Sequence, residues 1–346
     1  MMVFCKKGKK AQIEVQFNWI FVLIVGAVIL VFFIAIVNVQ KKAADKNLAY
    51  DILGKIDLII SGALTIPKTG QIFDMPRIDF NFQCDRISAF GVDKQFQDRI
   101  VFGPDLLRGR RLVVWSQDWN VPYKTANFLY VTSDNVRYII YYNVTEQDAN
   151  ELNTELPDNI TKEIVPSSDF SGLEDRNNYK VRMIFLGDAD YYTDIHNPDF
   201  LPQFMKDMPD SAVTAVQFFE NDVMFYEKRG DMLVTNEGLT VKILGKPMKY
   251  GAIFAEDLEM FNCSYYKAFK KLVYVSRVYS RRESALNISY ADNNDCKGQA
   301  RADTEIDQIA EAANSTPPDI VGIESSEGTI ATKNNNALER SCAPVY

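Results

Sequence analysis

An uninterrupted apolar segment near the N-terminus constrains this chain more than any other feature. From Trp19 to Val37 the sequence reads WIFVLIVGAVILVFFIAIV, which is 19 residues without a charged or strongly polar side chain. As an α-helix rising about 1.5 Å per residue, the segment spans roughly 30 Å, the thickness of the hydrocarbon core of a bilayer. Trp19 begins the segment, where an indole ring suits the headgroup region. The sequence therefore predicts a transmembrane helix over residues 17–40.

The sequence after this segment favours an uncleaved signal-anchor. A cleaved signal peptide has a shorter apolar core, roughly 7–15 residues, followed by a small-x-small cleavage site. Here the apolar run ends in Asn38-Val39-Gln40-Lys41-Lys42, and cleavage after Ala44 would place Lys42 at the −3 position. Residues 1–16 form the more basic flank. The positive-inside rule then predicts a cytoplasmic N-terminal tail and an extracytoplasmic remainder at the cell membrane.

The charge of the chain is unevenly distributed. Residues 1–42 contain six Lys and one Glu, a net charge of +5. Because the formal charge of the whole chain is −8, residues 43–346 carry a net charge of −13. An ectodomain this acidic is repelled by nucleic acid, and we expect no nucleic-acid partner.

Cysteines and glycosylation motifs fit an exported ectodomain. Cys5 lies in the tail, and the remainder contains Cys84, Cys263, Cys296 and Cys342, which allow two disulfides in three connectivities. The alternative is four buried thiols. Asn-x-Ser/Thr motifs, candidate N-glycosylation sites, occur at Asn143, Asn159, Asn262, Asn287 and Asn314.

A second helical pattern follows the apolar segment. Apolar residues recur at three- and four-residue steps at Leu48, Ile52, Ile56, Ile59 and Ala63. This predicts an amphipathic helix over residues 41–66, continuous with the transmembrane helix over about 45 residues in total. The apolar stripe is either a core face of the ectodomain or the contact of a homo-oligomer.

The rest of the chain predicts an α+β ectodomain with a mainly antiparallel sheet over residues 67–255. Ile78, Phe80 and Phe82 alternate with polar residues, segments 127–131 and 136–142 suggest a β-hairpin, and residues 212–244 suggest a meander. Residues 256–346 predict a helical C-terminal region. It contains a long helix over Glu256–Leu286, a short one over Ala302–Ala313, and a Ser/Thr/Asn-rich loop over Ser315–Asn336.

One polar cluster is a candidate metal site. Asp188, Asp190 and Asp194 follow a predicted strand, and His196 is the only histidine of the chain. Carboxylate oxygens are ligands for a divalent cation such as calcium or magnesium. The alternative is a solvated turn, and the spacing matches no known calcium loop. Trp115 and Trp119 similarly suggest either an aromatic binding platform or core residues at a strand end.

Motifs for catalysis are missing from the sequence. There is no G-x-S-x-G, no P-loop and no G-x-G-x-x-G, and a single histidine excludes a multi-histidine metal centre. We therefore expect a protein that is not an enzyme and has no resident cofactor.

The opening of the chain resembles a known group. Residues Lys10–Phe21 (KAQIEVQFNWIF) and the apolar run that follows are similar to the start of archaeal single-pass membrane-anchored surface proteins with uncharacterised ectodomains. Segments 102–131 and 338–346 are also similar to that group. The resemblance implies no activity. The same opening resembles the signal of archaeal type IV pilins, in which a glutamate occupies the fifth position after the processing site. With Glu14 as that residue, cleavage would follow Lys9 rather than Gly8.

The sequence thus predicts a single-pass membrane-anchored surface protein with a binding or envelope-structural role. Its expected partners are the bilayer, through residues 17–40, and a protein or glycan at the cell surface. The alternatives are a pilin-like filament subunit and a membrane-tethered metal-dependent enzyme that uses the Asp188–His196 segment.

Overall fold

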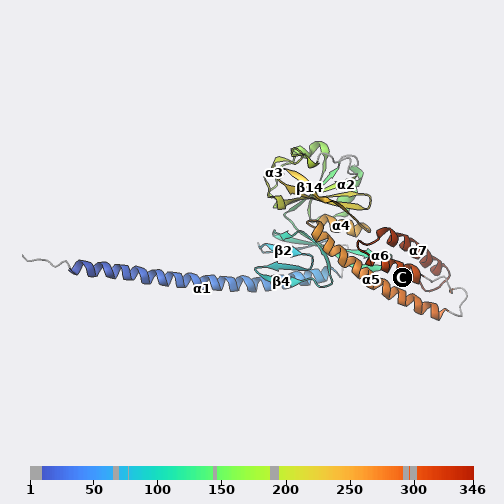
Figure 1. Cartoon of the computed structure of the whole chain (residues 1–346), viewed down its shortest axis with the longest axis horizontal. Coiled ribbons are helices and arrows are strands. Elements are labelled where there is room, and N and C mark those ends of the chain that lie inside the picture. The colour runs from blue at the N-terminus through green and yellow to red at the C-terminus, as the bar shows by residue number, and fades with distance from the viewer. Residues whose placement is uncertain are drawn as a thin grey trace, which may run out of the picture. The chain divides into compact units, whose positions relative to one another are not determined.

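The computed structural model describes residues 10–64, 70–76, 78–142, 146–187, 195–290, 296 and 302–346, with side chains from residue 19 onward except those of residues 236–238 (Figure 1). The chain divides into two compact units. One comprises residues up to Ile52 with Phe90–Val92, and the other comprises Leu53–Ala89 and Asp93–Tyr346.

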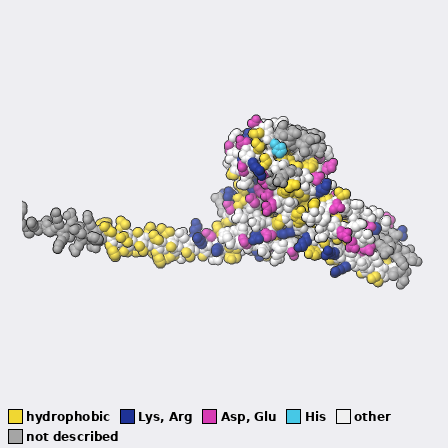
Figure 2. All heavy atoms as spheres, viewed as in Figure 1, with side chains coloured by type: hydrophobic (Ala, Val, Ile, Leu, Met, Phe, Trp, Pro, Cys, Tyr) yellow, Lys and Arg dark blue, Asp and Glu magenta, His cyan; other side chains and the backbone are white. Residues whose placement is uncertain are grey.

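Helix α1 (Lys10–Ala63) contains the predicted membrane segment. Its apolar side chains are exposed along the whole stretch that follows Trp19, and Figure 2 shows them as a nearly continuous hydrophobic surface followed by basic side chains. The helix is long and apolar enough to cross a membrane. The predicted continuity with residues 41–66 is confirmed, although the helix has 54 residues rather than about 45 and ends at Ala63.

The last turns of α1 are held by polar contacts within the second unit. Ile56, Ile60 and Ala63 are buried, as expected for the core-face interpretation of the apolar stripe. The Ser116 hydroxyl donates to the carbonyl of Ala63 at 2.8 Å, and the Asn127 amide donates to the carbonyl of Leu64 at 2.6 Å. These bonds satisfy carbonyl groups that a helix end leaves without intrahelical partners.

Two four-stranded sheets follow α1. The first has the order β1-β7-β8-β5, and the second has the order β4-β3-β2-β6. The strands are β1 (Gln71–Asp74), β2 (Phe80–Gln83), β3 (Arg86–Ala89), β4 (Val92–Gln95), β5 (Ile100–Phe102), β6 (Leu106–Leu107), β7 (Arg111–Asn120) and β8 (Lys124–Ser133). Most of their described pairings are antiparallel, and the alternation predicted around Phe80 and Phe82 buries both rings.

The largest sheet has six strands in the order β10-β9-β11-β12-β13-β14. These are β9 (Val136–Tyr142), β10 (Thr161–Pro166), β11 (Lys180–Leu186), β12 (Val213–Phe219), β13 (Asp222–Arg229) and β14 (Met232–Lys242). The first four in the sheet are parallel, and the last two continue as the predicted antiparallel meander. The α+β class is therefore confirmed, but the parallel centre was not predicted.

The predicted hairpin of segments 127–131 and 136–142 is wrong. Strand β8 pairs with β7, whereas β9 lies between β10 and β11 in the other sheet. The burial of β9 explains the difference, because six of its seven residues are buried in the structure. Such a strand is covered on both faces, as inner strands of parallel sheets are, and cannot be half of a surface hairpin.

Different elements cover the two faces of the six-stranded sheet. Helix α2 (Glu146–Glu155) connects β9 to β10 on the face that contributes Tyr138 and Ile140. The 3₁₀ turn η1 (Ser167–Gly172) and α3 (Gln203–Asp207) cover the opposite face. Parallel strands with connections on both faces form a doubly wound arrangement, in which the order of the strands reverses between β9 and β11.

Four helices follow the sheets in the described chain: α4 (Lys246–Phe254), α5 (Leu258–Ser289), α6 (Asp303–Asn314) and α7 (Ile320–Glu339). The long and short helices predicted over Glu256–Leu286 and Ala302–Ala313 are thus confirmed. Helix α5 begins where the Asp257 carboxylate accepts from the Met260 amide at 2.8 Å. Helices α5, α6 and α7 lie side by side (Figure 1), and α4 and α5 share one hydrophobic core with two of the sheets.

The predicted loop over Ser315–Asn336 is wrong, because α7 occupies most of it. Its buried apolar residues, Ile320, Ile323, Ile330 and Ala337, recur at helical spacing, but small and polar residues between them obscure the pattern. Asp319 caps the helix by accepting from the Gly322 amide at 3.1 Å. Here tertiary packing outweighs low intrinsic helix propensity.

Two buried cations join the six-stranded sheet to the α4–α5 connection. The guanidinium of Arg182 donates to the carbonyls of Ala252 at 2.8 Å, Ile253 at 3.2 Å and Glu256 at 2.9 Å. The Lys180 ammonium pairs with Glu256 at 2.5 Å and Asp105 at 2.6 Å. Burial opposes the charge of Lys180, but the two carboxylates outweigh this effect and raise its pKa.

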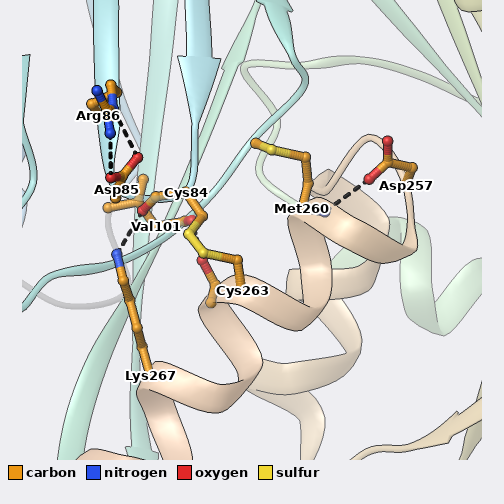
Figure 3. The surroundings of a disulfide bond; sticks show 9 residues. Cys84, Asp85, Arg86, Val101, Asp257, Met260, Cys263 and Lys267 are labelled. Atoms are coloured by element: carbon orange, nitrogen blue, oxygen red, sulfur yellow. Dashed lines mark hydrogen bonds and ion pairs between the residues drawn. A yellow bond between two sulfur atoms is a disulfide. The ribbon is translucent and has the colours of Figure 1, made fainter. Parts of the chain in front are cut away.

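The four cysteines after α1 form two disulfides. Cys84 is bonded to Cys263 and Cys296 to Cys342, with Cα–Cα distances of 6.0 and 5.6 Å. The first links the end of β2 to α5, where the Lys267 ammonium also donates to the Cys84 carbonyl at 2.9 Å (Figure 3). This arrangement selects one of the three connectivities that the sequence allowed.

The Cys296–Cys342 bond is expected to stabilise the C-terminal helices. Replacing both cysteines with Ser removes a cross-link across 46 residues and should lower the free energy of unfolding by about 2–4 kcal/mol. Thermal unfolding of the full chain in non-ionic detergent measures the change, and peptide mapping without reductant identifies the pairs. Cys5→Ser is the matched control. An unchanged melting temperature in the double variant would contradict the prediction.

Glu283 of α5 is a buried carboxyl group that makes stability depend on pH. Burial raises its pKa to about 7, against the lowering influence of Arg282 and of the Ala302 backbone amide. A raised folded-state pKa contributes stability below the unfolded value, near 4.5, and this contribution is lost as the pH rises through 7. Glu283→Gln should therefore be the more stable protein at alkaline pH, on the order of 2–3 kcal/mol, with little difference in acid. Melting curves across this pH range test it, and a pH-independent difference would contradict it.

Candidate functional site

The structure tests the predicted metal site only in part. Asp188, Asp190 and Asp194 lie outside the described residues. His196 is described, and its Nδ1 lies 2.8 Å from the carbonyl oxygen of Leu233. Within the described ranges, no group of three or more His, Cys, Asp or Glu side chains is placed to hold a metal ion. The cation site therefore stays a prediction.

Gly187 locates the start of this acidic segment. It follows β11 directly, and its amide donates to the carbonyl of Phe218 at 2.9 Å. Its φ of 112° lies in a region that residues with a Cβ rarely adopt. Strand β11 consequently ends at the carboxyl edge of the parallel strands, beside the point where the order of the strands reverses. Ligands of doubly wound sheets bind outside this edge.

A hollow of about 260 Å³ lies at the same edge, and we call it the carboxyl-edge hollow. The ends of β11 and β12, the start of α4, and α2 form it. Its lining residues are Asp148, Glu151, Leu152, Glu155, Leu186, Gly187, Phe218, Glu220, Lys246 and Lys249. Four carboxylates and two ammonium groups therefore converge on one small volume.

Part of this charge is neutralised within the hollow. The Lys246 ammonium pairs with Glu151 at 3.0 Å and also with Glu155. Hydrogen bonds from Lys246 lower the pKa of Glu151, and those to both glutamates raise the pKa of Lys246. The Tyr250 hydroxyl donates to Glu155 at 2.9 Å, which orients that carboxylate. Glu151 and Glu155 stand four residues apart on α2, so they share one helix face.

Lys249 is the second cation of the hollow and is held differently. Its ammonium lies 5.2 Å from the centre of the Phe218 ring, a cation–π contact. Burial lowers the pKa of Lys249, against the opposing influence of Glu155 and Asp148. An ammonium with little solvent gains more from a bound carboxylate than an exposed one does. The hollow thus offers a cation for an acid group and carboxylates for an amine.

Sequence reasoning missed this hollow because its parts have no motif. Its residues come from four elements. The one signal in the sequence is the four-residue spacing of Glu151 and Glu155, which would place both on one face of a helix. The aromatic-platform alternative for Trp115 and Trp119 is not supported, since both rings are buried in the core.

The glycosylation candidates differ in their accessibility. Asn159 and Asn314 are exposed, and Asn314 is the last residue of α6. Asn262 and Asn287 are half-buried on α5, and Asn143 lies outside the described residues. Asn159 and Asn314 are therefore the described positions best placed to carry a glycan.

Comparisons of the chain with protein-family models, with curated proteins and with solved structures give no match. Any function must therefore be argued from the geometry of the sites themselves.

Proposed function

We propose that this chain is a single-pass membrane protein whose extracytoplasmic domain binds a small zwitterionic ligand in the carboxyl-edge hollow. The observation that carries the proposal is the mixed charge of that hollow at the edge where doubly wound sheets bind ligands. Its volume lies slightly below the usual range of about 300–1,000 Å³ for ligand pockets, which favours a small molecule.

The placement in a membrane, with the domain after α1 outside the cytoplasm, has three supports. Helix α1 exposes an apolar surface that only a bilayer or another apolar partner would cover. The two disulfides are typical of proteins in an oxidising compartment. The basic tail before the helix favours a cytoplasmic N-terminus.

The orientation can be tested with the one cysteine outside the disulfides, Cys5. A membrane-impermeant maleimide should label Cys5 only after intact cells are permeabilised, and a protease added to intact cells should digest the ectodomain. Labelling of the ectodomain cysteines after reduction is the control for access. Labelling of Cys5 in intact, unreduced cells would refute the cytoplasmic tail.

The pilin-like alternative makes a different prediction for the same preparation. The continuous helix from Lys10 to Ala63, with its exposed apolar surface, is suited to packing against other copies in a filament. N-terminal sequencing distinguishes the two functions, because an anchor keeps its tail whereas a processed pilin would begin at Lys10.

The ligand proposal predicts a specific effect of Lys249. Small zwitterions such as glycine, glutamate and lysine, added separately to the full chain in detergent, should include at least one that raises the melting temperature by mass action. In Lys249→Met the ligand-induced rise should disappear, while the unliganded protein keeps or gains stability because a buried charge is removed.

Lys242→Met is the matched control, since Lys242 pairs with Asp222 outside the hollow and its loss should leave the ligand effect intact. If none of the zwitterions shifts the melting temperature, or if Lys249→Met retains the full shift, the proposed ligand class is wrong.

A further inference from the structure

Helix α5 carries a concentration of positive charge that the rest of the ectodomain lacks. From Met260 to Arg282 the sequence contains six Lys or Arg and no Asp or Glu, within an otherwise acidic ectodomain. Two of the six are used internally, because Lys267 donates to the carbonyl of Cys84 and Arg282 to that of Pro344. The others have no such role among the described contacts.

Most cations elsewhere in the ectodomain are paired with carboxylates, including Arg99, Arg137, Lys180 and Lys246. No carboxylate of the described residues lies within ion-pair distance of Lys270, Arg277 or Arg281. An acidic protein that pairs most of its cations but leaves these without carboxylate partners presents a local site for an anion.

These cations lie on one helix face together with exposed aromatic rings. Tyr266, Lys270, Tyr274, Arg277 and Arg281 follow one another at steps of four, four, three and four residues, and we call them the α5 basic face. Tyr266 is 44% and Tyr274 56% exposed. Large exposed rings between unpaired cations are costly to leave in water without a partner and are enriched at binding surfaces.

The α5 basic face is hollowed rather than flat. A hollow of about 270 Å³ lies between it and the connection from α6 to α7. Buried Phe269 and Val273 form its floor, Tyr266, Lys270, Tyr274 and Arg277 form one side, and Ala313, Asn314, Ser315 and Thr316 form the other. Cations, phenol rings, hydroxyls and an amide therefore surround an apolar floor.

We propose that this hollow binds one acidic sugar residue of an extracellular polysaccharide. Arg277 and Lys270 would pair with its carboxylate, the tyrosine rings would cover the apolar face of the sugar, and the Thr316 hydroxyl would meet its hydroxyls. A bilayer surface cannot enter a recess between α5 and the α6–α7 connection. A flat protein surface would reach the cations but leave the recess empty.

This site is separate from the carboxyl-edge hollow and shares none of its lining residues. The inference rests on the proposed extracytoplasmic location only for its biological setting, because binding is measured with purified protein. Failure of the orientation test and failure of the glycan test are therefore distinguishable.

The experiment measures binding of the full chain, in non-ionic detergent at about 0.15 M salt, to immobilised polygalacturonate and to neutral dextran. We expect binding to polygalacturonate only. Lys270→Ala combined with Arg277→Ala should weaken binding by at least about tenfold. Tyr274→Ala, which leaves the charge unchanged, should also weaken it, since a purely ionic attraction would not depend on the ring.

The control exchanges two exposed cations elsewhere, Arg110→Ala with Arg340→Ala, and removes the same charge. Equal weakening by this control, or full binding by Tyr274→Ala, would overturn the proposal in favour of nonspecific attraction. Absence of polygalacturonate binding would also overturn it. Equal, Arg277-dependent binding to phosphatidylglycerol vesicles, or Arg277-dependent self-association, would assign the surface to a membrane or to a second copy instead. Melting curves of each variant verify that it folds.

Discussion

The buried cations of β11 are the constraint on which the rest of the domain after α1 depends. Arg182 is almost fully enclosed, and its guanidinium is satisfied by carbonyls at the end of α4 and by that of Glu256 before α5. An unpaired buried charge costs several kcal/mol, so the sheet and the α4–α5 connection can only be stable together. Lys180 extends the link to Asp105, which precedes β6, and thereby joins the six-stranded sheet to the smaller sheet before it.

This link also explains how the carboxyl-edge hollow is positioned. Arg182 fixes the last turn of α4, and the first turn of the same helix supplies Lys246 and Lys249. Strand β11, which carries Arg182, ends two residues before the acidic segment that follows Gly187. One buried guanidinium therefore sets the distance between the helix that provides the cations and the strand end that provides the wall. A recess built in this way is formed before any ligand arrives, which reduces the entropy lost on binding.

Sequence reasoning succeeded where a pattern was long and continuous. The apolar run of α1, the stripe around Ile56 and the periodicity of α5 each specify an element by themselves. It failed where the deciding interaction was distant. Strand β9 has a hairpin-like turn before it but pairs with β10 and β11, and α7 is helical because Ile323 and Ile330 are buried, not because of its propensities. The carboxyl-edge hollow was not predicted for the same reason, because its lysines and glutamates come together only through the crossover of α2 and the placement of α4.

The distribution of ion pairs distinguishes the carboxyl-edge hollow from the α5 basic face. In the carboxyl-edge hollow, Lys246 and Glu151 already neutralise each other, so a ligand there must replace or join existing contacts and is selected by fit. On the α5 basic face, Lys270 and Arg277 have no carboxylate within the described contacts, so an anion adds new pairs and is selected first by charge. The net charge of −13 over residues 43–346 repels anions in general, so the proposed binding at α5 depends on the local reversal of sign there. If the proposed acidic polysaccharide binds, the orientation of the protein on it is set by α5, because that face attracts the polymer while the net charge of the domain repels it.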